Sequence, residues 1–128
     1  MARVLVVDEN KYLRQLYALE LASEGYEVVL AADVNEALER LKTIRPDIVV
    51  MDVGRRATDR TPDTAHILRN TYKLPVILNT TQDLSTDSSL VSVADAYLVK
   101  SSDMSELKAT IRELLVRSSH HNEREVLV

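Results

Sequence analysis

The sequence predicts an α/β fold in which a doubly wound parallel sheet of five strands carries helices on both faces. The first observation is a set of short apolar runs, of which Val4–Val7 and Ile48–Met51 are apolar throughout and rich in β-branched residues. Such runs are typical of strands buried in a parallel sheet. The second observation is that helical patterns lie between the runs, which predicts successive βαβ units. The five runs are Val4–Val7, Val28–Ala31, Ile48–Met51, Val76–Leu78 and Tyr97–Val99.

The first two helices have recognisable ends. Apolar residues between positions 13 and 21 follow a loose 3.6-residue spacing, and Gly25 suits the position just after a helix. Asp33 and Glu36 form a capping-box pattern that opens the second helix. We expect Pro46 to stop that helix, because proline cannot continue it.

The later helices differ in how clearly the sequence marks them. Residues 63–72 predict a weaker helix. The segment Thr80–Ser92 is rich in Ser, Thr and Asp, which compete with the helical backbone for hydrogen bonds, so we expect a short, frayed fourth helix there. Asp103 and Glu106 are expected to cap the last helix. Its apolar stripe consists of Leu107, Ile111, Leu114 and Leu115.

These elements suit a flavodoxin-like sheet with the strand order 2-1-3-4-5. In that order, ligands bind at the switch point beside the carboxyl ends of strands 1 and 3. We predict one domain over residues 1–117 and a flexible, mostly polar C-terminal tail over residues 118–128.

Composition excludes several classes of function. The 128 residues are 45% hydrophobic, which predicts a globular chain, and the absence of cysteine excludes disulfides and thiol catalysis. No apolar run is of membrane-spanning length and no signal-peptide pattern opens the chain, so we expect a cytoplasmic protein with no membrane contact. The net charge of −4 disfavours direct nucleic-acid binding.

Three carboxylates stand at the ends of two predicted strands. Asp8 and Glu9 follow the first strand, and Asp52 follows the third. If the first strand ends at about Asp8, all three converge at the switch point, where their repulsion calls for a cation or protons. Mg²⁺ suits such a site, because it takes few protein carboxylates and keeps room for water and a phosphate oxygen.

Each candidate residue also has an ordinary explanation. Asp8 could cap the first helix, and Asp52 could be a solvated strand end. Thr80 could simply end the fourth strand, Lys100 could be a surface lysine, and Tyr97 could belong to the core or its rim. The functional interpretation therefore depends on where these residues lie together.

Four motifs placed at strand ends resemble those of a known family. They are VLVVDEN at strand 1, the Pro46-Asp47 step before IVVMD at strand 3, LPVILNTT at strand 4 and ADAYLVK at strand 5. From about Arg3 to Val116 the chain resembles the receiver domains of bacterial two-component response regulators.

The resemblance implies a phosphoryl-accepting site. Asp52 matches the phosphoacceptor, and Asp8 and Glu9 match the acidic pair that binds Mg²⁺. Gly54, two residues after the acceptor, falls in the same metal site. The implied chemistry is phosphoryl transfer to a carboxylate nucleophile, with no other enzyme activity.

The resemblance also implies a conformational switch. Lys100 matches the lysine that contacts the phosphoryl group, Thr80 the switch hydroxyl and Tyr97 the switch aromatic. A phosphoryl group on Asp52 would draw in Thr80, and Tyr97 would turn into the space it leaves, which is a population shift. The implied partners are a histidine kinase or phosphotransfer protein as donor and a downstream protein as target.

Two alternatives remain beside a stand-alone phosphorylated switch. The loop after Asp52 lacks the family's Met-Pro step, and Ser101 replaces the usual proline after Lys100, which favours a degenerate receiver that binds partners without phosphorylation. A different α/β class is disfavoured: a haloacid-dehalogenase-type phosphatase would need an Asp where Gly54 stands. A flavodoxin-type flavin site would need a phosphate loop where Asp8 and Glu9 stand.

Overall fold

Five parallel strands form one sheet in the order β2-β1-β3-β4-β5, which confirms the predicted fold class and strand order. The computed structural model describes residues 1–52, 61–81, 91–101 and 103–127, without the side chains of 61, 62 and 119–127. The predicted fourth helix falls largely on residues 82–90, and so lies mostly outside the described residues, as does Gly54. The strands are β1 (Arg3–Val7), β2 (Glu27–Ala31), β3 (Ile48–Met51), β4 (Val76–Thr80) and β5 (Ala96–Val99).

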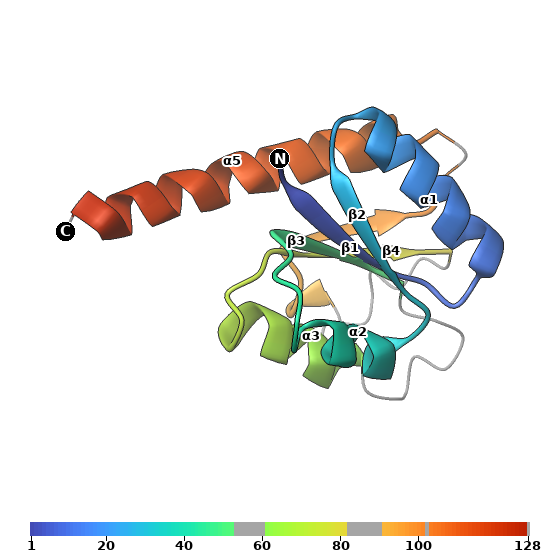
Figure 1. Cartoon of the computed structure of the whole chain (residues 1–128), viewed down its shortest axis with the longest axis horizontal. Coiled ribbons are helices and arrows are strands. Elements are labelled where there is room, and N and C mark those ends of the chain that lie inside the picture. Colours follow the sequence, from blue (N-terminus) through green and yellow to red (C-terminus); the bar gives the residue numbers. More distant parts are fainter. Residues whose placement is uncertain (53–60, 82–90, 102, 128) are drawn as a thin grey trace.

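Helices cover both faces of this sheet (Figure 1). Two of them, α1 and α5, lie on one face, while α2 and α3 lie on the other. The described helices are α1 (Lys11–Ser23), α2 (Val34–Arg40), α3 (Thr61–Asn70) and α5 (Ser105–Leu127).

The sheet separates two apolar cores, because successive strand side chains point to opposite faces. On the α2 and α3 face, alternate strand residues pack with Ala37 and Leu68. On the α1 and α5 face, the intervening strand residues pack with Tyr17, Leu21 and Ile111. Strands buried on both faces explain the unbroken apolar runs in the sequence.

The ends of α1 follow known capping rules. The Asn10 side chain accepts hydrogen bonds from the backbone of Tyr12 and Leu13. At the other end, Gly25 has φ +92° and donates to the Ala22 carbonyl, while Tyr26 donates to the Leu21 carbonyl. This is a Schellman motif, and it confirms Gly25 as the residue after the helix.

The second helix confirms its predicted start and corrects its predicted end. The Asp33 carboxylate accepts from the Glu36 backbone at 2.8 Å, while the Glu36 carboxylate pairs with Arg40. The helix ends at Arg40, well before Pro46. It tightens there into a turn, in which Lys42 and Thr43 donate to carbonyls three residues earlier.

The last helix extends further than the sequence indicates. The backbone of α5 is helical to Leu127, so most of the segment predicted as a loose tail is helical. Each residue added to a formed helix gains a hydrogen bond, so a polar segment can continue a helix nucleated by a packed stripe. The domain boundary at residue 117 and the flexibility of the tail stay predictions. Across the described part of the chain, no helix has the combined length and apolarity that crossing a membrane requires.

Candidate functional site

Three charged side chains meet at the carboxyl edge of the sheet, and we call Asp8, Asp52 and Lys100 the acid–lysine cluster. The Lys100 Nζ lies 2.6 Å from Asp8 Oδ2 and 3.4 Å from Asp52 Oδ2. All three side chains are largely buried, with exposed fractions of 8% for Lys100, 2% for Asp8 and 14% for Asp52. The structure therefore joins three of the residues that the sequence singled out.

Strand register explains this meeting. Val7 of β1 lies beside Met51 of β3, so the next residues along both strands, Asp8 and Asp52, are neighbours. The Asp52 backbone N–H donates to the Val7 carbonyl at 2.8 Å. On the far side of β4, the Lys100 backbone donates to the Thr80 carbonyl at 2.6 Å, which fixes where the lysine side chain begins.

Hydrogen bonds from nearby side chains hold the turn after β1 in place. Asp8 Oδ1 accepts from the Asn10 backbone N–H at 2.9 Å. The Arg14 guanidinium, one turn into α1, donates to the carbonyls of Asp8 and Glu9 at 2.7 and 3.1 Å. The chain thus leaves the sheet at Asp8, as predicted, and Glu9 is exposed.

The carboxylates keep Lys100 charged. Burial is the largest influence and lowers the pKa of its ammonium, but the hydrogen bond that Lys100 donates to Asp8 and the charges of Asp52 and Asp8 outweigh burial. The net effect raises the pKa of Lys100 above its ordinary 10.5. The cluster thus has two carboxyl groups for one ammonium, before Glu9 is counted.

Thr80 and Tyr97 project to the face of the sheet opposite the cluster. Thr80 ends β4 and is 3% exposed. Tyr97 of β5 lies beside Leu78 and packs against the α2 and α3 core. The switch roles of both residues stay predictions.

Sequence reasoning missed three polar residues that support the site: Arg14, Tyr17 and Asn79. Tyr17 is 3% exposed and Asn79 4% exposed, and the Asn79 amide donates to the Tyr17 hydroxyl at 3.1 Å. Burial raises the pKa of Tyr17, although the Lys100 charge and the Asn79 hydrogen bond oppose that shift. One signal was available, because Asn79 directly follows the apolar run Val76–Leu78, as Asp52 follows Ile48–Met51.

The cluster fits Mg²⁺ by donor chemistry. Asp8 and Asp52 offer hard carboxylate oxygens, and the excess negative charge favours a divalent cation. Among residues 1–52, 61–81, 91–101 and 103–127, no three His, Cys, Asp or Glu side chains are grouped as a ready metal site. The metal roles of Glu9 and Gly54 stay predictions.

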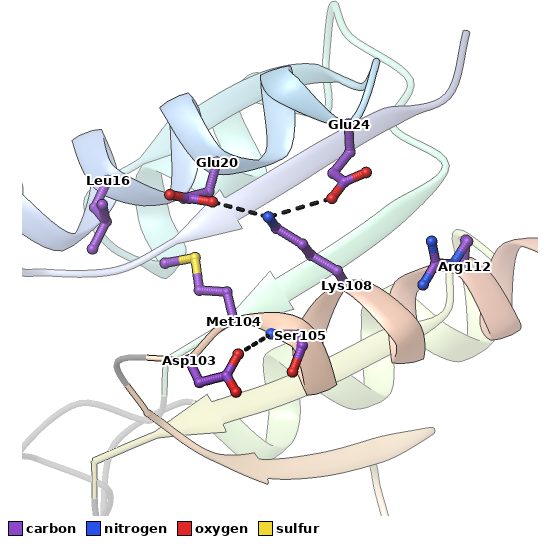
Figure 2. Close-up of a pocket in the computed structure, with 8 residues that line it drawn as sticks. All are labelled: Leu16, Glu20, Glu24, Asp103, Met104, Ser105, Lys108 and Arg112. Atoms are coloured by element: carbon purple, nitrogen blue, oxygen red, sulfur yellow. Dashed lines mark hydrogen bonds and ion pairs between the residues drawn. The ribbon is translucent and has the colours of Figure 1, made fainter.

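A separate groove of about 450 Å³ lies between α1 and α5 (Figure 2). Lys108 reaches across it, with Nζ 2.9 Å from Glu20 Oε2 and 3.3 Å from Glu24 Oε1. No member of the acid–lysine cluster lines this groove. The groove is therefore separate from the acid–lysine cluster, and the Lys108 ion pairs across it join α1 to α5.

A five-stranded 2-1-3-4-5 sheet with acids and a lysine at its switch point defines the class of CheY-like receiver domains. The family model described as "Response regulator receiver domain" matches residues 4–112, and the chain belongs to that family.

Relatives and solved structures agree with this membership. The chain is 33% identical over 120 residues to the transcriptional regulatory protein TrcR of Mycobacterium tuberculosis, covering 92% of this chain and 47% of TrcR. It is 34% identical over 128 residues to BasR of Escherichia coli, covering 98% of this chain and 58% of BasR. The chain thus spans about half the length of the curated relatives it matches.

Among solved structures, the response regulator TrrA of Thermotoga maritima, in complex with Mg²⁺-BeF, matches with a TM-score of 0.80 and 32% identity. That match covers 89% of this chain and 99% of TrrA. The receiver domain of the Francisella response regulator 1452 matches with a TM-score of 0.79 and 28% identity, covering 92% of this chain and 99% of that domain.

Proposed function

We propose that this chain is a phosphorylation-dependent signalling switch that accepts a phosphoryl group on Asp52. The observation that carries the proposal is the position of the Lys100 ammonium, 3.4 Å from Asp52 Oδ2 and 2.6 Å from Asp8 Oδ2. A lysine bridging two carboxylates at a switch point is poised to neutralise charge on an incoming phosphoryl group.

The transfer is a displacement at phosphorus. A carboxylate oxygen of Asp52 forms the new bond to phosphorus, and the bond to the donor breaks with its electron pair leaving on the donor. Asp52 is the accessible carboxylate, at 14% exposure against 2% for Asp8. Asp8 is committed to Lys100 and the Asn10 backbone, so it orients the cluster rather than attacking.

Mg²⁺ would be held by Asp8 and Asp52, with Glu9 and Gly54 as further members of the site. When bound, it supplies electrostatic stabilisation of the charge on the transferring group. The Mg²⁺-BeF complex of TrrA supports this assignment for a chain of the same fold at 32% identity. Lys100 contributes the second positive charge at the same place.

The phosphoryl group would then change the presented surface through Thr80 and Tyr97. A bound phosphoryl group adds negative charge and acceptor oxygens, which attract the Thr80 hydroxyl. A histidine kinase or phosphotransfer protein would be the donor, and a protein the downstream target. Direct nucleic-acid binding by this chain is not expected at net charge −4, although TrcR and BasR are named transcriptional regulatory proteins.

A degenerate receiver that binds partners without phosphorylation is the second candidate. The observation that favours it is the departure of the segment after Asp52 and of Ser101 from the family pattern. It predicts that partner binding is the same for the wild type and for Asp52→Asn.

The test is incubation with acetyl phosphate and Mg²⁺, followed by intact-mass measurement. The wild type should gain one phosphoryl group, and Asp52→Asn should gain none. Asp47→Asn is a matched control, because Asp47 is an exposed aspartate that accepts from the Arg3 backbone at the opposite edge of the sheet. Equal modification of the wild type and Asp52→Asn would refute the acceptor assignment.

A further inference from the structure

A buried polar pair joins α1 to β4 next to the acid–lysine cluster. Asn79 Nδ2 donates to Tyr17 Oη at 3.1 Å, across 62 positions of sequence. Both residues are almost fully buried, at 4% and 3% exposure. Burying a hydroxyl and an amide costs free energy that one hydrogen bond only partly offsets, so an apolar pair would serve packing at least as well.

The pair lies in the same row of the sheet as the two aspartates. Val7, Met51 and Leu78 lie side by side across β1, β3 and β4, so the next row is Asp8, Asp52 and Asn79. Val6, Val50 and Ile77, two positions earlier on these strands, all pack in the α1 and α5 core. Because side chains alternate, all three residues of the next row project to the face that Tyr17 covers.

We propose that Tyr17, held by Asn79, is a positioning residue that sets where the Lys100 ammonium stands relative to Asp8 and Asp52. The inference rests on the proposed function, because it assigns Tyr17 a part in phosphoryl transfer to Asp52. Tyr17 does not react; it acts through Lys100.

The connection between Tyr17 and Lys100 runs through the end of β4. Asn79 immediately precedes Thr80, whose carbonyl accepts the Lys100 backbone N–H at 2.6 Å. Moving the Asn79 side chain therefore shifts the carbonyl on which Lys100 is anchored. On α1, Arg14 lies one turn before Tyr17 and holds the Asp8 carbonyl at 2.7 Å, so the same helix fixes both partners of the ion pair.

The experiment compares Tyr17→Phe, which removes only the hydroxyl, with the double variant Tyr17→Phe, Asn79→Leu, which removes the whole polar pair. Tyr26→Phe is the matched control, because Tyr26 packs in the same core without this contact. Two quantities are measured at fixed pH. One is the ¹⁵Nζ resonance of Lys100, assigned by its loss in Lys100→Arg, and the other is the rate of phosphorylation by acetyl phosphate with Mg²⁺.

Both Tyr17 variants should move the Lys100 resonance and slow phosphorylation by about two- to tenfold, the range expected from one hydrogen bond. Tyr26→Phe should do neither. Melting temperatures confirm that each variant is folded under the assay conditions. The inference is overturned if Tyr17→Phe matches Tyr26→Phe, or if the double variant recovers the wild-type rate and resonance, since the pair then serves packing alone.

Failure of the proposed function is distinguishable from failure of this inference. If the wild type gains no phosphoryl group, the function fails. A Lys100 resonance that still moves in Tyr17→Phe supports the positioning role in that case. A resonance that stays in place overturns it.

Discussion

Replacing Lys100 by methionine tests whether the acid–lysine cluster is held together by its one cation. Methionine keeps most of the side-chain length and removes the ammonium, so Asp8 and Asp52 lose their shared partner. The two carboxylates then remain close and largely desolvated. We expect Lys100→Met to lower the free energy of unfolding at pH 7.

The magnitude follows from distance and burial. At an effective dielectric constant of 20, the attractions at 2.6 and 3.4 Å are about 6 and 5 kcal/mol before desolvation is subtracted. In the intact cluster, desolvation costs several kcal/mol per ion and removes most of that gain. Without the Lys100 ammonium, the desolvation cost of the two carboxylates remains and the attraction of the lysine is lost, so the free energy of unfolding should fall by about 3–5 kcal/mol. The double variant Lys100→Met, Asp8→Asn should recover part of the loss, because it removes one unpaired charge.

Urea unfolding at pH 7 measures this loss. With an m value near 2 kcal/mol/M, the midpoint should fall by about 2 M. Lys108→Met is the matched control, since Lys108 also bridges two carboxylates, Glu20 and Glu24, at 2.9 and 3.3 Å. Those carboxylates are 42% and 39% exposed, so water screens the pairs and the control should lose much less stability than Lys100→Met. Equal losses in the two variants would refute the argument that burial makes the Lys100 cluster costly to break.

Two further predictions concern the same edge of the sheet. Mg²⁺ in the millimolar range should raise the melting temperature, because a ligand that binds the native state stabilises it, and Asp8→Asn should weaken that response. A wild-type melting curve indifferent to Mg²⁺ would count against the metal site. The raised pKa of Tyr17 means that the folded state holds the phenol proton more tightly than the unfolded state, whose pKa is near 10.0. That stabilisation is complete below pH 10.0 and is lost as the pH rises through the folded pKa, so stability above pH 10.0 should fall less in Tyr17→Phe than in the wild type or Tyr26→Phe.

The strands and the principal cluster could be predicted because they depend on local patterns. Unbroken apolar runs are typical of buried parallel strands, and the order of such strands follows from the fold class. Asp8, Asp52 and Lys100 each come directly after a strand, so the topology brings them to one edge. The place of Lys100, 92 positions after Asp8, was predicted from the resemblance to receiver domains rather than from these patterns.

Other features depend on tertiary contacts that no local pattern encodes. Tyr17 looks like an ordinary core residue on an amphipathic helix, and only the packing of α1 on β4 gives it Asn79 as a partner. Arg14 looks like a solvated helix residue, yet it turns back to the carbonyls of Asp8 and Glu9. The helical end of α5 was not predicted, because its polar residues show no hydrophobic periodicity. A helix that starts from a packed apolar stripe can extend into such a segment without that periodicity.

The division of the interior into two cores implies an order of events during synthesis. The core under α2 and α3 draws its buried residues from Leu5 to Leu78, so it can close before the last helix is made. The core under α1 also needs Met104, Leu107, Ile111 and Leu114, all near the C-terminal end of the chain. Until α5 leaves the ribosome, a nascent chain therefore carries an apolar sheet face that α1 covers only in part, and chains truncated before residue 104 should bind an apolar dye that the full chain excludes. The acid–lysine cluster is complete in sequence by Lys100, but α5, which packs on the face of the sheet that carries this cluster, is made only afterwards.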